Sequence, residues 1–208
     1  RARLVKRLTE DLGAYDLYLK GRYFQNREDP DRMINAKECF EQAIARDPNF
    51  ASAYAGLAST YWMIDFQSDL DIGEAAHKAR EAAEKALALD DASSEAHSAM
   101  GVIYEIFDWD WGKAEQEFRR AIALNRNSME AHHEYSLLLS RMGRFEEAQV
   151  EMRHAQELDP LSYVVRGGVV EVFLWSRQYE RIINEFPIEE TCDHSAYIGL
   201  AYVQQDKH

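Results

Sequence analysis

The sequence predicts an all-α fold, built as an array of antiparallel helix hairpins, from three observations. The chain of 208 residues has 46% hydrophobic residues but only 4 Pro and 10 Gly, a composition that favours helices. Apolar residues recur at helical spacing, as between Met129 and Pro160, where Gly143 separates two short helices. Small residues recur at matching intervals. Because a single hairpin cannot bury its own apolar face, each one needs a neighbour of its own kind.

The intervals between small residues measure the repeat. The alanines near the ends of the expected second helices are Ala43, Ala86, Ala121 and Ala155. The small residues in the expected first helices are Ala53, Ala96, Ala131 and Val165. Both series have intervals of 43, 35 and 34 residues, which argues against chance similarity. The first interval places nine surplus residues between Tyr61 and Ala79.

The elements can be placed in chain order. Residues 1–13 are charged and carry leucines four residues apart, which indicates a lead-in segment or a linker from an upstream domain. The array is expected over residues 14–208. Its hairpins are expected over residues 14–48, 51–91, 94–126, 129–160 and 163–187, and a terminal helix over residues 194–205.

Each hairpin has its own start and stop signals. In the first, a polar turn with Pro30 separates helices over 14–26 and 31–47, and Pro48 ends the second of them. In the second hairpin, the long connection IDFQSDLDIG precedes a strongly helical segment over residues 74–90. These signals predict two helices joined by a tight turn in the first hairpin and by a longer loop in the second.

The later hairpins carry more distinctive turns. The third turns at DWDWG before a helix that starts at Lys113, and at least one of Trp109 and Trp111 is expected to close the hairpin, since Trp is usually buried. An exposed aromatic contact is the alternative. The fifth hairpin turns at Arg177, and Pro187 is expected to cut its second helix short.

Charge and cysteine content limit the function classes. The net charge of −13 and the pI near 5.0 oppose a basic surface for phosphate backbones, so no nucleic acid is expected to bind this segment. Cys39 and Cys192 lie far apart without metal spacing, so neither a disulfide framework nor a zinc site is indicated. No run of about 18 apolar residues occurs, so we expect no membrane insertion.

No constellation of residues indicates catalysis. The neighbouring His132, His133 and Glu134 would point about 100° apart on a helix and would not converge on one ion. Cys192 and His194 could form an active thiolate only if the fold oriented the imidazole toward the sulfur. No Gly-rich phosphate loop, nucleophile elbow or metalloprotease motif occurs. We therefore expect no enzyme activity, no catalytic residue, no cofactor and no metal.

A family resemblance rests on a pattern of a large residue, Leu-Gly, an aromatic residue, and then Ala, an aromatic residue, Ala and Pro. The residues that carry it are Tyr54, Leu57, Ala58 and Tyr61, then His97, Met100, Gly101 and Tyr104, then Ala114, Phe118 and Ala121, and in the first hairpin Ala36, Phe40, Ala43 and Pro48. The chain thus resembles the tetratricopeptide repeat family, with Asp91 and Arg126 departing from the usual closing proline. The resemblance implies a right-handed superhelical solenoid.

A narrower resemblance concerns the segments AYDLYLKGRYF, AYAGLASTY, FDWDW with KAEQEFRRAI, and GRFEEA with AQELDPLS. They are similar to repeat regions of bacterial signalling proteins, in which the array follows a winged-helix DNA-binding domain, a nucleotide cyclase or a serine/threonine kinase. This resemblance implies a regulatory role. The chain begins at Arg1 without a methionine, and we take it for a piece of a longer protein.

The expected function is that of a non-catalytic protein–protein interaction module, which binds a partner segment in a concave groove lined by the first helices. Helical phase assigns to this groove the residues that do not point at a neighbouring layer. They are Tyr18, Arg22, Ser52, Ala55, Ser59, Trp62, Glu95, Val102, Glu105, Glu130, His133, Leu137, Arg141, Gly167, Glu171 and Leu174.

The expected partner follows from this lining. It mixes carboxylates with apolar and aromatic residues, and only Arg22 and Arg141 are basic, so no clamp for a terminal carboxylate is present. We expect a neutral to basic segment with an apolar anchor near Trp62 or Leu137. The alternative is homo-oligomerisation through the exposed solenoid end, because solenoid ends need capping. We expect a cytoplasmic location, or a periplasmic one if a membrane helix precedes the chain.

Overall fold

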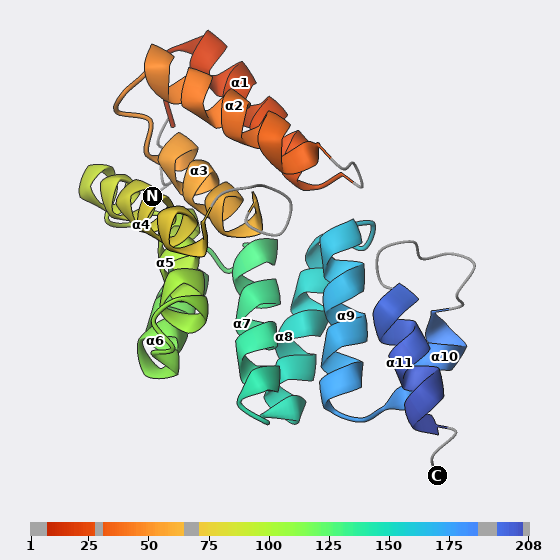
Figure 1. Cartoon of the computed structure of the whole chain (residues 1–208). Helices are drawn as coiled ribbons and strands as arrows, with labels where there is room; N and C mark the ends of the chain where they lie inside the picture. Colours follow the sequence, from red (N-terminus) through yellow and green to blue (C-terminus); the bar gives the residue numbers. More distant parts are fainter. Residues whose placement is uncertain (1–7, 28–30, 65–70, 187–194, 206–208) are drawn as a thin grey trace, which may run out of the picture. The chain divides into compact units, whose positions relative to one another are not determined.

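The fold was obtained as a computed structural model, which describes residues 8–27, 31–64, 71–186 and 195–205 (Figure 1). These residues form eleven α-helices and no strand, as the sequence predicts. The chain divides into two compact units, residues 1–126 (the first unit) and residues 127–208 (the second unit), a division that the sequence did not predict. None of the described helices is long and apolar enough to cross a membrane.

The first unit consists of three helix hairpins. Their helices are α1 (Leu12–Gln25) with α2 (Arg32–Arg46), α3 (Ala51–Ile64) with α4 (Ile72–Leu89), and α5 (Ser94–Ile106) with α6 (Trp111–Leu124). The first helices α1, α3 and α5 contact one another in sequence, and α2 and α4 each contact the following first helix. The hairpins therefore stack as the repeat pattern requires. Residues 65–70, in the expected long loop, lie outside the described residues.

Glycines and aromatic rings build the core of the first unit. Phe40 of α2 is fully buried between α1 and α3, where a Cβ on Gly21 would lie 2.7 Å from its ring and a Cβ on Gly56 would lie 2.6 Å from it. Phe118 of α6 meets Gly101 of α5 in the same way, at 2.6 Å. These close approaches explain why small residues and aromatic residues recur at fixed intervals, since each ring needs the space of a missing side chain.

Aspartate caps set the starts of three helices. Asp11 accepts a hydrogen bond from the N–H of Ala14, Asp71 from that of Gly73 and Asp110 from that of Lys113. Helices α1, α4 and α6 consequently begin two residues earlier than the sequence analysis placed them. A carboxylate at this position satisfies one of the backbone donors that a helix start leaves unpaired.

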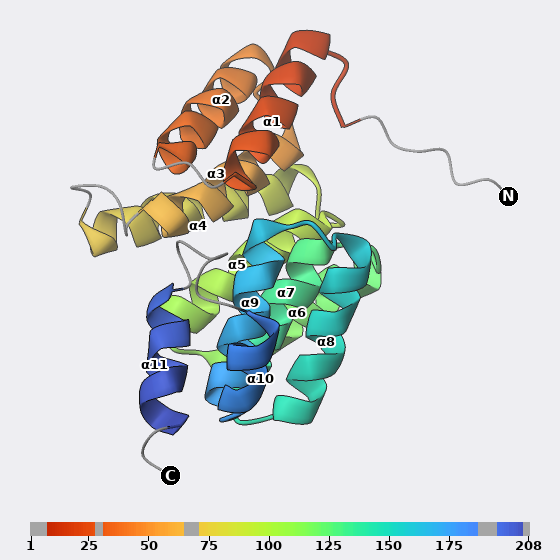
Figure 2. The same ribbon diagram turned by 90° about the vertical axis from the view of Figure 1, so that its right-hand side faces the viewer.

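The second unit contains α7 (Met129–Arg141) with α8 (Phe145–Leu158), then α9 (Tyr163–Trp175) with α10 (Tyr179–Glu185), and α11 (Ser195–Gln205). Helix α9 lies beside α7 and α8 in both views (Figure 1, Figure 2). Helix α10 has 7 residues, half the 14 of α8, as predicted for the fifth hairpin. Residues 187–194, which include Pro187, Cys192 and His194, lie outside the described part of the chain.

Three hairpins carry a left-handed residue at the same repeat position. One residue after each of α5, α7 and α9 adopts the left-handed conformation: Trp109 (φ 56°), Gly143 (φ 76°) and Arg177 (φ 58°). Successive members of this set are 34 positions apart in the sequence. In the fourth and fifth hairpins the next amide, that of Arg144 or Gln178, donates a 2.9 Å hydrogen bond to the carbonyl of Leu139 or Phe173, four residues before the turn residue. In the third hairpin the amide of Asp110 donates a 2.9 Å hydrogen bond to the carbonyl of Tyr104, five residues before Trp109. The bonds in the fourth and fifth hairpins are those of the common glycine-ended helix stop, and the turn of the third hairpin is one residue longer. Trp109 is 76% exposed, whereas Trp111 starts α6 and is half-buried.

Candidate functional site

The predicted groove residues lie on the first helices of the hairpins, α1, α3, α5, α7 and α9. They fall in both units, so the candidate site is described separately for each. In each unit, hydrogen bonds and burial decide which side chains other molecules can reach.

In the first unit the structure joins three of the predicted residues. The hydroxyl of Tyr18 on α1 donates a 2.8 Å hydrogen bond to Oε1 of Glu95 on α5, and Nη1 of Arg22 lies 3.9 Å from the same oxygen. The Tyr18 ring also packs on Phe40 and Phe50, with ring centroids 6.0 and 5.2 Å apart. Burial, and then the charge of Glu95, raises the pKa of Tyr18 well above its usual range. Tyr18 therefore stays protonated and links α1 to α5.

A second polar contact holds α1 against α3. The side-chain amide nitrogen of Gln25 lies 2.9 Å from the hydroxyl of Ser59, 2.9 Å from that of Thr60 and 3.2 Å from the carbonyl of Gly56. Gln25 is buried, and sequence reasoning missed it. Its position seven residues after Tyr18, two turns along the same helix face, is the signal that could have found it. Ser59 thus contributes to packing within the unit.

The other predicted residues of the first unit differ in exposure. Trp62, near the end of α3, is half-buried. The buried ones are Ser52, Ala55, Val102 and Glu105. Burial leaves these four little surface to offer a ligand.

In the second unit, predicted residues meet two aromatic side chains that sequence reasoning missed. Oε1 of Glu171 on α9 lies 3.1 Å from Nη2 of Arg141 on α7 and accepts a 3.3 Å hydrogen bond from the indole of Trp175. Trp175 is 51% exposed and Tyr197 on α11 is 41% exposed. Tyr197 lies on α11, which contacts α9, and burial, followed by the charge of Glu171, raises the pKa of its phenol. We call Arg141, Glu171, Trp175 and Tyr197 the aromatic face.

The aromatic face combines a fixed ion pair with two accessible rings. Glu171 orients both the guanidinium of Arg141 and the indole of Trp175. An exposed indole held by a hydrogen bond offers a large contact area at low cost in conformational entropy, and the exposed phenol of Tyr197 is a second aromatic surface. Trp175 follows the predicted Leu174 and lies one turn after Glu171, so the helical period was a signal that could have found it. The arrangement suits the binding of a peptide side chain.

The remaining predicted residues of the second unit are less accessible. His133 and Leu137 are buried, Gly167 is buried, and Glu130 and Leu174 are half-buried. His133 lies at the crossing of α7 with α9, where a Cβ on Gly168 would come within 2.6 Å of its Nε2 atom. The structure therefore brings Arg141 and Glu171 together in an accessible place and uses His133 in helix packing.

Two histidines form equivalent contacts in successive hairpins. Nδ1 of His97 lies 2.5 Å from a carboxylate oxygen of Glu117, and Nδ1 of His132 lies 2.6 Å from one of Glu151. Each pair joins the first helix of a hairpin to its second helix. Within the described ranges, no group of three His, Cys, Asp or Glu side chains is placed to hold a metal ion.

Sequence comparison gives two kinds of similarity. The tetratricopeptide repeat model matches residues 17–50 and 130–160, in the first and fourth hairpins. The chain is also similar to the transcriptional regulator HilA of Salmonella paratyphi A and of Salmonella typhimurium, with 27% identity over 169 residues in each case. That alignment covers 81% of this chain and 30% of the regulator, so the chain spans less than a third of these relatives.

Solved structures show the same fold. A thermophilic TPR protein of Thermus thermophilus has a TM-score of 0.55 and 22% identity, over 77% of this chain and 95% of its own. The pilF protein of Pseudomonas aeruginosa has a TM-score of 0.57 and 18% identity, over 94% of this chain and 86% of its own. At these identities the similarity concerns the fold alone.

Proposed function

Because the chain is built of tetratricopeptide repeats, we propose that it is a non-catalytic protein-interaction module whose aromatic face binds a neutral to basic partner segment. The observation that supports this proposal is the pair of accessible rings, Trp175, whose indole donates to Glu171, and Tyr197. Exposed aromatic rings attract the cationic groups of Lys and Arg. The net charge of −13 also favours basic partners over acidic ones.

The apolar anchor of the partner is assigned to Trp175 and Tyr197. Sequence reasoning placed it near Trp62 or Leu137, but Leu137 is 7% exposed whereas Trp175 is 51% exposed. An aromatic residue that is accessible in the unbound protein and held by a hydrogen bond has the properties of a binding hot spot. We therefore expect the partner's apolar side chain to contact the Trp175 ring.

The test compares two labelled peptides of equal length and equal apolar content, one carrying lysines and the other glutamates. We expect fluorescence anisotropy to show tighter binding of the lysine peptide. Trp175→Ala should weaken it at least about tenfold, the range for loss of an aromatic hot spot. Trp109→Ala, which removes an exposed Trp of the first unit, is the matched control and should leave the affinity unchanged. Tighter binding of the glutamate peptide through Trp175 would contradict the proposal.

We further propose that the module is the regulatory part of a larger signalling or transcription-regulator protein. The 27% identity with HilA across 81% of the chain supports this role. Sequencing the natural gene upstream of the codon for Arg1 tests it. A winged-helix, cyclase or kinase domain there is the expected result, and a start codon directly before Arg1 would overturn it.

The second candidate function is assembly with another copy through α11. This helix leaves Leu200, Tyr202 and Val203 exposed by 43%, 37% and 52%. Exposed apolar side chains at the end of a repeat array favour association. Sedimentation velocity over a wide concentration range tests assembly, and a strict monomer at all concentrations would exclude it.

A further inference from the structure

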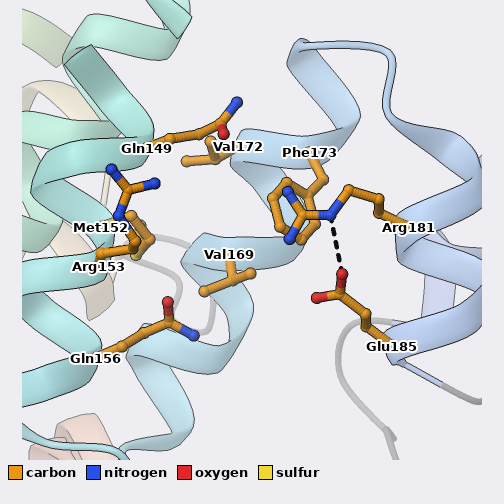
Figure 3. Close-up of a pocket in the computed structure, with 9 residues that line it drawn as sticks. All are labelled: Gln149, Met152, Arg153, Gln156, Val169, Val172, Phe173, Arg181 and Glu185. Atoms are coloured by element: carbon orange, nitrogen blue, oxygen red, sulfur yellow. Dashed lines mark hydrogen bonds and ion pairs between the residues drawn. The ribbon is translucent and has the colours of Figure 1, made fainter. Parts of the chain in front are cut away.

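The second unit contains a pocket between α8, α9 and α10 that shares no residue with the aromatic face (Figure 3). Its volume is about 90 Å³, which suits one side chain. Its apolar lining consists of Met152 from α8 and Val169, Val172 and Phe173 from α9. These four side chains are nine-tenths or more buried, so they form a fixed apolar surface at the bottom of the pocket.

The pocket lies where the repeat is interrupted. Arg153 and Gln156 line it from the second half of α8. The residues 34 positions later come after Glu185, the last residue of α10. Helix α10 therefore does not extend along this half of α8, whereas a second helix of 14 residues, like α8 itself, would. The pocket therefore lies beside the short second helix of the fifth hairpin, at the end of α10.

Two guanidinium groups define the charge of the pocket. Arg181 of α10 lies over the Phe173 ring at 4.0 Å from its centroid, and its Nε lies 2.9 Å from Oε1 of Glu185. The ring and the carboxylate hold this guanidinium in place, and its Nη2 atom makes no hydrogen bond to a described residue. Arg153 forms no ion pair with any described residue. With Glu185 counted, the lining carries a net positive charge on a protein of net charge −13.

We propose that this pocket binds an acidic partner segment in which a Glu or Asp adjoins an apolar residue. The apolar side chain enters between Met152 and Phe173, and the carboxylate pairs with Arg153 and Arg181. Guanidinium groups bind carboxylates with two parallel hydrogen bonds, which gives both affinity and orientation. The side-chain amide of Gln149, on the α8 side, supplies a donor and an acceptor for the backbone of an extended segment.

A larger pocket in the first unit provides a contrast. It lies in the first unit along α3 and α4, with a volume of about 640 Å³. Its charged lining residues are Lys78 and Lys85 with Glu81 and Glu84. Equal numbers of each charge give no preference for an acidic or a basic ligand. Of these two pockets among the described residues, it is the one beside α10 whose charge selects a class of partner.

The experiment uses the whole chain and the two labelled peptides described above, the glutamate peptide and the lysine peptide. The glutamate peptide should bind in a manner that depends on Arg153, and Arg153→Gln should weaken it about tenfold, the range for loss of a charge-assisted hydrogen bond. Arg120→Gln, which removes an exposed Arg of the first unit, is the matched control and should change nothing. Trp175→Ala should also leave the affinity for the glutamate peptide unchanged, which separates this site from the aromatic face.

A second variant tests the pocket without changing its charge. Gln156 is exposed at the pocket, and Gln156→Trp should block the apolar entrance while far-UV circular dichroism stays as in the wild type. Loss of glutamate-peptide binding in this variant supports the proposal. Undiminished binding in both Arg153→Gln and Gln156→Trp would overturn it. Tighter binding of single-stranded DNA than of the glutamate peptide would also overturn it, by assigning the arginines to phosphate groups.

Discussion

The shared turn after α7 and α9 allows a test in which two substitutions have opposite effects. Gly143 has φ 76°, and a Cβ built on it meets no atom within 4 Å. Gly143→Ala therefore adds no clash and changes only the backbone energy. An L-residue in the left-handed conformation costs about 1–2 kcal/mol, and the lower entropy of the unfolded chain returns about 0.4–1 kcal/mol. The expected net loss of stability is about 1 kcal/mol.

Arg177 has the same place in the fifth hairpin, with φ 58° and an exposed side chain. Arg177→Gly should thus raise the free energy of unfolding by up to about 1 kcal/mol, because glycine adopts the left-handed conformation without strain and the exposed arginine contributes little packing. For a chain of this size, each change corresponds to about 2–4 °C in Tm. Because the two turns are separate, the double variant should return close to the wild-type value.

The assay is urea unfolding followed by far-UV circular dichroism, with hydrogen exchange at the amide of Arg144 as a local readout. That amide donates to the carbonyl of Leu139 across the turn, so its protection should fall in Gly143→Ala. Two stability changes of the same sign, or no change in Gly143→Ala, would refute the reasoning that backbone conformation controls these turns.

Two further predictions concern the first unit. Burial, and then the carboxylate of Glu41, raises the pKa of Tyr61 to about 12 from 10.0. Its contribution to stability is therefore complete below pH 10 and is lost as pH rises from 10 to 12. Urea midpoints should fall across this range, and they should fall less in Tyr61→Phe, in which the raised pKa of Tyr18 still contributes. Phe40→Ala should lower the free energy of unfolding by about 3–5 kcal/mol, because the ring fills the space between Gly21 and Gly56. Thermal unfolding measures this loss. Phe24→Ala is the control and should lose less stability, because its ring is only half-buried.

The sequence predicted the fold well because the repeat is a packing requirement. Phe40 can sit between two helices only where Gly21 and Gly56 omit a side chain, so small residues must recur at the crossing positions. Such a constraint is local and periodic, and it can be read without coordinates. Helix starts were less predictable, because Asp11 and Asp110 cap their helices from outside the apolar pattern.

The candidate site was only partly predictable. Helical phase places Tyr18 and Glu95 on the inner faces of their helices, but it does not show that they hydrogen-bond to each other across 77 residues. Arg141 and Glu171 were assigned to the groove from phase alone, and the structure places them in contact. Tyr197 was missed because it lies on a terminal helix that was left out of the groove. Phase identifies a face, while packing decides which side chains remain accessible.

The residues at the positions of the histidine pairs differ in the fifth hairpin, beside the pocket of α10. The pair in the fourth hairpin is His132 with Glu151, and 34 positions later these places hold Arg166 and Glu185. Glu185 pairs instead with Arg181 on its own helix and orients that guanidinium over Phe173. The glutamate at this repeat position thus joins two helices in the fourth hairpin, whereas in the fifth it orients Arg181 beside the pocket. Glu185, the last residue of α10, thus lines the pocket and holds its oriented charge.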